Sequence, residues 1–143
     1  MSREIESIIA DFRDITAKAV ESGEGIDQIY TLCQEVEDLE DPPQAFPAFF
    51  ELMERLPNSD LGSPGELVHT MEQHIGSYED LLEDSMRRLP TYLTVWMVNR
   101  ILNVPSADRD RWLPLLRSVE THPTATEGIK SEARMFLERQ DTT

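Results

Sequence analysis

The sequence predicts an all-α fold of about eight short antiparallel helices, and three observations support this prediction. Apolar residues recur at spacings of three and four through most of the chain, as they do on one face of a helix. Val and Ile never alternate with polar residues over a useful length, so no strand is predicted. Proline and glycine interrupt the pattern often. A stack of helical hairpins (HEAT-like) and an irregular helical bundle both satisfy these observations.

The expected helices begin near capping residues and end at glycine or proline. They cover residues 2–21, 26–37, 43–55, 64–76, 77–90, 91–103, 107–120 and 124–139, and residues 140–143 are expected to fray. Ser63 and Pro64 suit the N-cap and first position of the fourth helix, and Ser77 and Thr91 suit the caps of the next two. Gly76 suits the end of the fourth helix.

The segment 91–103 is apolar nearly all round, which predicts a central, buried helix. Arg100 lies on it and is expected to pair with an acidic residue or to cap a neighbouring helix end. Ile75 is expected on the buried face of the fourth helix. Ser106 is expected to cap the seventh helix, where Pro114 requires either a start near residue 111 or a kink.

The length and composition indicate one domain. A chain of 143 residues is long enough to bury a sizeable core, so we expect a single all-helical domain over residues 1–143. No run of 18 apolar residues occurs, and the N-terminal sequence MSREIESIIADF is acidic where a signal peptide is basic, so a cytoplasmic protein is expected. The single cysteine, Cys33, excludes an internal disulfide and is expected to be a buried structural thiol.

The net charge of −15 is unevenly distributed. Residues 1–62 hold 15 acidic and 4 basic side chains, whereas residues 63–143 hold 13 acidic and 9 basic ones. This charge disfavours binding to nucleic acid or to an anionic membrane, because both need clustered Lys and Arg. It favours a basic partner through electrostatic steering, although an acidic surface also serves solubility alone.

The densest acidic stretch, named here the acidic run, is residues 35–41, with five carboxylates. It covers the C-terminal end of the second predicted helix, where the helix macrodipole disfavours each negative charge by about 0.3–1 kcal/mol. Because these carboxylates destabilise the helix, their presence suggests that they form a binding surface. A solvated loop without a partner is the alternative.

No pattern in the sequence predicts a catalytic or metal site. His69 and His74 are five residues apart and do not share a helix face, and the pair of His69 with Glu72 gives only two ligands. The sequence contains no glycine-rich phosphate loop, no nucleophile elbow and no Cys–His arrangement. We therefore expect no catalytic residue, no metal and no cofactor.

Three strings carry a resemblance to a known family. LGSPGELVHTMEQ, YEDLLEDSMRRLPT and TVWMVNRILN resemble a group of small all-helical bacterial immunity proteins that are encoded beside polymorphic or contact-dependent toxins. The resemblance covers residues 61–103, and more loosely 111–113 and 132–133, and lies in turn and core residues. It implies a non-enzymatic protein that neutralises the C-terminal domain of a cognate toxin, typically a basic nuclease or another cytosol-acting enzyme. A monomer in a 1:1 complex, with an acidic surface that occludes the active site, is then expected.

The candidate partner-binding residues are one aromatic residue, which the helical spacing places on the inward face of the second helix, and two acidic clusters, of which the first is favoured. They are Tyr30, Glu37, Asp38, Glu40 and Asp41, and then Glu79, Asp80 and Glu83. Two other functions stay open at this point. One is a helical scaffold or adaptor module, and the other is a small metal-dependent hydrolase that would bring His69 and His74 together with acidic residues.

Overall fold

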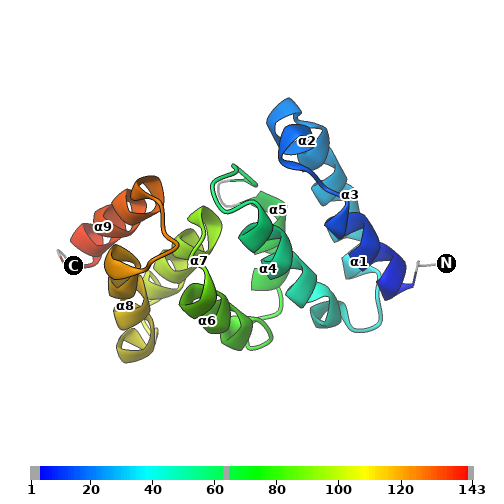
Figure 1. The fold of residues 1–143 in the computed structure, drawn as a ribbon. Coiled ribbons are helices and arrows are strands. Elements are labelled where there is room, and N and C mark those ends of the chain that lie inside the picture. The colour runs from blue at the N-terminus through cyan, green and yellow to red at the C-terminus, as the bar shows by residue number, and fades with distance from the viewer. Residues whose placement is uncertain (1–3, 63–64, 142–143) are drawn as a thin grey trace.

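A computed structural model describes residues 4–62 and 65–141, and Figure 1 shows their arrangement. This part of the chain is all-helical and has no strand, which confirms the predicted fold class. The predicted cap of the fourth helix, Ser63 with Pro64, lies outside the described residues. The helices are α1 (Ile5–Arg13), α2 (Ala17–Ser22), α3 (Glu24–Glu37), η1 (Pro42–Ala45), α4 (Phe46–Arg55), α5 (Gly65–Glu72), α6 (Glu79–Arg88), α7 (Tyr92–Leu102), α8 (Arg109–Ser118), η2 (Val119–Thr121) and α9 (Glu127–Asp141), where η marks a 3₁₀ helix.

The helices pack as hairpins stacked in two layers. α1 pairs with α3, α6 with α7, and α8 with α9. In one layer α1 contacts α4, α4 contacts α6, and α6 contacts α8. In the other layer α3 contacts α5 and α7 contacts α9, while Arg100 of α7 donates two hydrogen bonds of 2.8 Å to Glu72 of α5. The contacts are those of a helical-hairpin stack, the first of the two predicted arrangements.

The stack extends along one axis. The chain runs from one end to the other, so that the N-terminal helices and α9 lie at opposite ends (Figure 1). α2 packs against α3 at the N-terminal end, outside the hairpin order. Each hairpin therefore meets mainly its neighbours in the sequence.

A continuous apolar core lies between the layers. In the N-terminal half, Phe49 of α4 contacts Phe12 of α1 and Phe46, with ring centroids 5.1 and 5.3 Å apart, and all three are fully buried. In the C-terminal half the core is built on α7, which is buried over most of its surface as predicted. Trp96 of α7 meets Phe136 of α9 edge to face at 5.4 Å.

The predicted first helix, over residues 2–21, is two helices in the structure. The apolar stripe passes through the break, and Ile15 stays in the core at 2% exposed. Arg55 of α4 donates to the carbonyl oxygens of Phe12 and Ile15, at 3.0 and 2.8 Å, and so satisfies the end of α1. Thr16 then caps α2 through its hydroxyl. The break between α1 and α2 is stabilised by an arginine from another helix, so the local spacing of apolar residues could not predict it.

Two other helix starts differ from expectation. α3 begins at Glu24 rather than at residue 26, because Gly23 alone makes the break with its φ of +94°. Gly25 lies inside α3, where a Cβ atom would be 2.8 Å from the backbone nitrogen of Val20. This glycine therefore allows α2 and α3 to cross closely. The predicted third helix divides into the 3₁₀ turn η1 and the α-helix α4.

The turn between α5 and α6 also differs from expectation. α5 ends at Glu72, and Ile75, expected on the buried face, is 81% exposed. Gly76 has the expected left-handed conformation, with a φ of +99°, but it lies beyond the helix end. Ser77 is not a cap, since α6 begins at Glu79, whose carboxylate accepts from the Gly76 N–H at 2.9 Å. A carboxylate inside the first turn thus performs the capping.

α7 begins as predicted. Thr91 is its N-cap and forms a reciprocal capping box with Thr94, in which both hydroxyls are buried. The expectation that Arg100 pairs with an acidic residue is confirmed by its bond to Glu72. α7 is therefore fixed both at its start and to the preceding hairpin.

α8 and α9 begin and end differently from the prediction. Asp108, not Ser106, caps α8 by accepting from a backbone N–H. The helix starts too early for Pro114 to lie in its first turn, so the proline is inside it and one carbonyl lacks its usual donor. α9 starts later than expected, and Gln140, expected in a frayed tail, is buried and donates to Asn99 at 3.0 Å.

Candidate protein-binding surface

A groove of about 470 Å³ lies between α1 and α3 at the N-terminal end of the stack. Four carboxylates from the two helices line it, together with three uncharged residues. The lining residues are Asp11, Asp14, Asp27, Gln28, Thr31, Leu32 and Glu35. A partly enclosed, negatively charged groove suits a basic segment of another protein.

A second hollow, of about 560 Å³, lies where α1 begins and α3 has ended. Three carboxylates and an amide surround a small apolar base. Its lining residues are Glu4, Ile5, Leu39, Glu40, Asp41 and Gln44. We call the lining residues of the groove and of this hollow together the acidic surface.

The amphipathic pattern of the two helices places these carboxylates on one surface. α3 carries Asp27, Thr31 and Glu35 at spacings of four, which brings them onto one face. Asp11 of α1 and Asp14, the C-cap residue of that helix, are three residues apart and lie on one face in the same way. The opposite face of each helix carries core residues. Because these residues are buried, the acidic faces point toward the solvent.

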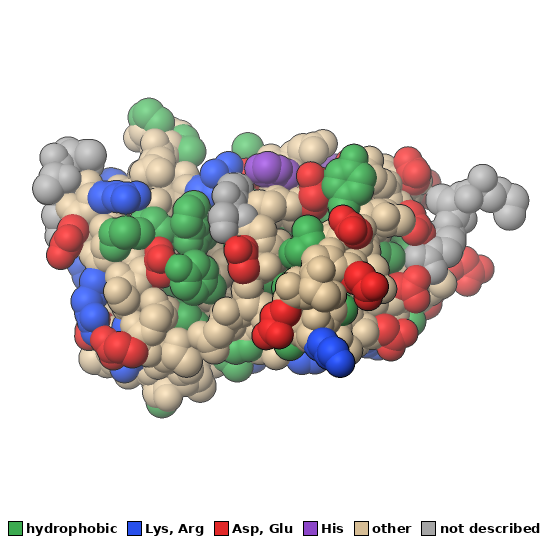
Figure 2. All heavy atoms as spheres, turned by 90° about the horizontal axis from the view of Figure 1, so that it is seen from above, with side chains coloured by type: hydrophobic (Ala, Val, Ile, Leu, Met, Phe, Trp, Pro, Cys, Tyr) green, Lys and Arg blue, Asp and Glu red, His purple; other side chains and the backbone are tan. Residues whose placement is uncertain are grey.

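Most of the carboxylates at this end have no neutralising partner within the fold. Asp14, Asp27, Asp38, Glu40 and Asp41 form no ion pair with any residue between positions 4–62 and 65–141. On the face drawn in Figure 2, acidic side chains are densest over the end that carries the N-terminus, whereas most Lys and Arg lie over the other end. The negative potential at the N-terminal end is therefore available to a partner.

The structure divides the first predicted cluster between two sides of α3. Glu40 and Asp41 line the second hollow, and Asp38 is exposed at the C-cap of α3. Glu37 instead turns toward the segment after α5, where its carboxylate lies 3.4 Å from Nε2 of His74. The fifth member, Tyr30, is 53% exposed, so the expectation that it faces inward is wrong; it lies three residues from Asp27 of the groove. The cluster thus borders the groove without forming one continuous patch.

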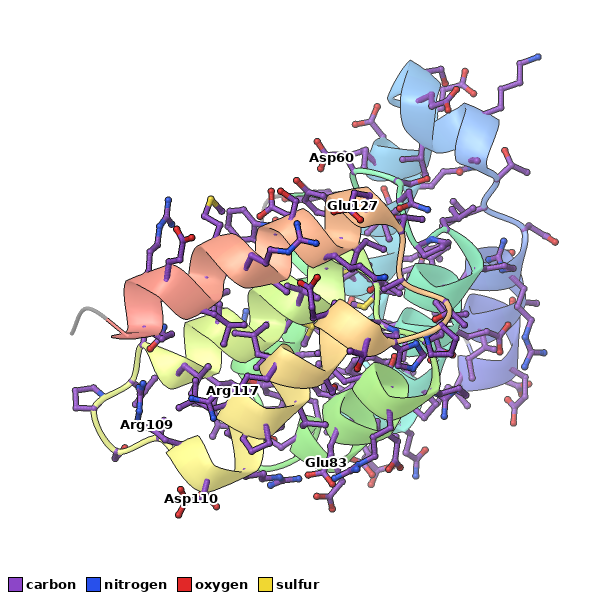
Figure 3. All side chains as sticks on the ribbon, turned by 60° about the vertical axis from the view of Figure 1, so that its left-hand side comes forward. Asp60, Glu83, Arg109, Asp110, Arg117 and Glu127 are labelled. Atoms are coloured by element: carbon purple, nitrogen blue, oxygen red, sulfur yellow. The ribbon has the colours of Figure 1, made fainter. Side chains whose placement is uncertain are left out.

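The second predicted cluster is occupied with contacts inside the fold. Glu79 caps the start of α6, as described above. Asp80 and Glu83 both accept from Arg111 of α8, at 2.8 and 2.7 Å, and Figure 3 shows Glu83 on α6 beside that helix. The hydrogen bond from Arg111 lowers the pKa of Glu83 below its usual value. Asp80 and Glu83 therefore join α6 to α8, and Glu79 stabilises the start of α6. These internal contacts favour the first cluster as a binding surface.

Sequence reasoning missed the carboxylates of α1 and of the first turns of α3. Asp11, Asp14 and Asp27 were not among the candidates, because they stand apart in sequence and form no charge run. The only signal in the sequence was the spacing of these residues, which places them on one polar face of each helix. That the two polar faces line one groove could not be predicted without knowing that α1 packs against α3.

The other chemistry-bearing residues have structural surroundings. Within positions 4–62 and 65–141 no group of three or more His, Cys, Asp and Glu residues is placed to hold a metal ion. Cys33 is fully buried, and burial is the main reason that the pKa of its thiol rises to about 12. This confirms the predicted buried thiol. No described helix is both long and apolar enough to cross a membrane.

Comparisons with family models, with curated proteins and with solved structures gave no significant match to this chain. The resemblance to immunity proteins therefore stays a prediction from the sequence.

Proposed function

We propose that this protein is an immunity protein, which binds a basic toxin domain in a 1:1 complex and neutralises it by covering the active site of the toxin with the acidic surface. The observation that carries the proposal is the concentration of carboxylates at the N-terminal end of the stack. Five of them form no ion pair within the described ranges, namely Asp14, Asp27, Asp38, Glu40 and Asp41. The resemblance of residues 61–103 to immunity proteins supports the same function. The cytoplasm, where such toxins act, is the proposed location.

The mechanism follows from the charges. A toxin that acts on nucleic acid carries a basic cleft, and the negative field of the acidic surface accelerates its association by about 10–1000-fold at low salt. The groove between α1 and α3 then accepts Lys or Arg side chains from the rim of that cleft. Tyr30 beside it supplies an exposed aromatic ring of the type that is enriched among binding hot spots.

The test uses the protein domain encoded directly upstream as the candidate partner. One variant neutralises four carboxylates of the acidic surface, Asp14→Asn, Asp27→Asn, Glu40→Gln and Asp41→Asn. A matched control neutralises four carboxylates elsewhere that form no described ion pair, Glu66→Gln, Asp84→Asn, Asp110→Asn and Glu138→Gln. Stopped-flow association at low and high salt is measured for each.

We expect the first variant to associate about tenfold or more slowly at low salt, and the control within about twofold of the wild type. The difference should shrink at high salt, because salt screens exposed charges. Equal effects of the two variants would overturn the acidic surface as the interface.

The second candidate function is a scaffold or adaptor module. The hairpin stack itself favours it, since such stacks present extended surfaces to other proteins. If the upstream domain forms no complex and the protein fails to protect cells that produce this domain, the scaffold function replaces the first proposal.

A further inference from the structure

Three connecting segments of the hairpin stack lie along one edge of the molecule. Residues 38–45 join α3 to α4, residues 73–78 join α5 to α6, and residues 103–108 join α7 to α8. Each of them leads from the layer of α3, α5 and α7 to the layer of α4, α6 and α8, so all three emerge on the same side, the lower side in Figure 1. Because neighbouring helices pack about 8–10 Å apart, the three segments form a row. We call this row the turn edge.

Two segments of the turn edge expose an aliphatic side chain. Ile75 is 81% exposed in the turn after α5, and Val104 is 51% exposed in the turn after α7. Together with Tyr30 they are the exposed large hydrophobic residues of positions 4–62 and 65–141. A single exposed aliphatic residue is ordinary, but two at equivalent positions of successive hairpins, on one edge, indicate a shared role.

Hydrogen bonds hold the turn around Ile75 in one conformation. Gly76 has a left-handed backbone, and its N–H donates to the carboxylate of Glu79 at 2.9 Å. The Ser77 N–H donates to the carbonyl oxygen of His74 at 3.0 Å. The outward position of Ile75 is therefore set by the turn, whose backbone hydrogen bonds are made within the chain.

The turn around Val104 is held in a similar way. The Val104 N–H donates to the carbonyl oxygen of Ile101 at 3.0 Å, and the Val104 carbonyl accepts from the Ala107 N–H at 3.0 Å. A partner that covers these turns loses little conformational entropy at this surface, because the turns are ordered beforehand. Both aliphatic side chains are therefore suited to be anchors of a protein–protein interface.

The turn edge carries negative charge at its N-terminal end. Glu40 and Asp41 line the second hollow of the acidic surface, around the apolar base formed by Ile5 and Leu39. Neither carboxylate forms an ion pair within the described ranges. A molecule that covers the whole row thus meets carboxylates first and aliphatic groups beyond them. This pattern is complementary to a protein surface on which basic residues border an apolar patch.

We propose that the turn edge continues the toxin-binding interface beyond the hollow, and that Ile75 and Val104 are its apolar anchors. The occupant is the toxin domain, so the inference rests on the proposed function. This domain places basic residues against Glu40 and Asp41, and an apolar patch against the two aliphatic side chains. The carboxylates mainly accelerate association, whereas the buried aliphatic groups mainly slow dissociation.

The test measures the association and dissociation rates of the complex with the domain encoded directly upstream. The variants are Ile75→Ser, Val104→Ser and the double variant, and Ile75→Val is the conservative change. Pro123→Ser is the matched control, because it removes an exposed apolar ring from the segment between η2 and α9, on the opposite edge. Circular dichroism verifies that each variant is folded.

We expect each serine variant to dissociate about fivefold or more faster, and the double variant about 25-fold or more faster. Their association rates should stay within about twofold of the wild type at low and high salt, unlike those of the variant that neutralises the acidic surface. Ile75→Val and Pro123→Ser should change neither rate by more than about twofold.

A second measurement uses the wild-type protein and so does not depend on the folding of a variant. In a methyl-labelled sample, saturation of the bound toxin domain should weaken the methyl signals of Ile75 and Val104. The methyl signal of Ile129, which is 1% exposed on α9, should be unaffected and is the internal control. Equal effects on all three residues, or none on Ile75 and Val104, would overturn the inference.

The outcomes separate this inference from the proposed function. A complex that forms, but dissociates at the wild-type rate in the double variant, would overturn the turn edge and leave the proposed function intact. Absence of any complex with the wild-type protein would overturn both. Self-association of the protein alone, seen by sedimentation velocity and abolished in the double variant, would make a second copy the occupant and so also overturn the inference.

Discussion

Charge is used differently at the two ends of the stack. Among α6–α9, Arg111 of α8 pairs with Asp80 and Glu83 of α6, and Arg134 of α9 pairs with Glu120 of η2, so that ion pairs join one helix to another. Arg134 also pairs with Glu127 within α9. On the α1–α3 pair the carboxylates of the acidic surface gather around a groove, and Arg13 is the only basic residue of these two helices.

This difference indicates which carboxylates stabilise the fold and which are available for binding. Carboxylates that bridge hairpins gain from their partners, whereas like charges crowded on one helix pair repel one another. Carboxylates that repel one another do not stabilise the folded chain, so binding to another molecule is the role we infer for them. The three predictions below test this division.

The largest effect is expected from Arg111→Ala in the C-terminal region. The change removes bonds to two carboxylates and the contact of the guanidinium with the Trp112 ring, 4.6 Å away. We expect a loss of about 1–2 kcal/mol in the free energy of unfolding, measured by urea denaturation. Arg117→Ala on the same helix, labelled in Figure 3, is the control and should cost less than about 0.5 kcal/mol. Equal losses would show that the ion pairs of Arg111 add nothing.

A smaller effect of opposite sign is expected from Asp38→Asn in the N-terminal region. Asp38 is exposed at the C-terminal end of α3, where its charge opposes the helix dipole. The variant should be more stable than the wild type by about 0.3–1 kcal/mol. The same substitution at Asp110, in the first turn of α8, should be destabilising by a similar amount. Changes of the same sign would contradict the dipole explanation.

The smallest effect is expected in the dependence of the Tm on pH. Glu83 and Glu120 have pKa values below the usual 4.5, mainly because each accepts a hydrogen bond from an arginine. A carboxylate with a lowered pKa in the folded state stabilises the fold above its unfolded pKa, and this contribution is lost as the pH falls through the folded pKa. The Tm should therefore decrease as the pH is lowered below about 4.5, and this decrease should be less steep in the variants Glu120→Gln and Arg134→Gln. Unchanged slopes in both variants would refute the link to this pair.

The fold class and the central helix were accessible from the sequence because their signals are local. Thr91 caps α7, the preceding proline ends α6, and an apolar surface all round α7 predicts its burial. The break between α1 and α2 was not accessible. Ile15 continues the apolar stripe through it, and Arg55, which stabilises it, is 40 residues away. Likewise, Glu79 and not Ser77 caps α6. Residue propensities do not distinguish between these two nearby candidates.

The candidate surface was predicted in part. The acidic run drew attention to the C-terminal end of α3, and Glu40 and Asp41 do line a hollow there. Asp11 and Asp14 escaped notice because two separated carboxylates on a helix resemble any solvated face. Glu83 was a candidate because the sequence cannot tell that Arg111 neutralises it. Whether an isolated carboxylate stabilises the fold or is available for binding can be judged only when its neighbours in space are known.

The hairpin order has a consequence for how partner preference can change. Since each hairpin meets mainly its neighbours, a substitution on α1 or α3 mainly affects α2, η1, α4 and α5, which contact these helices most. The C-terminal hairpins, with their arginine bridges and the core around α7, are shielded from it. If the acidic surface binds a partner as proposed, its side chains can change with little effect on the stability of the C-terminal hairpins, so that binding preference and folding can vary separately.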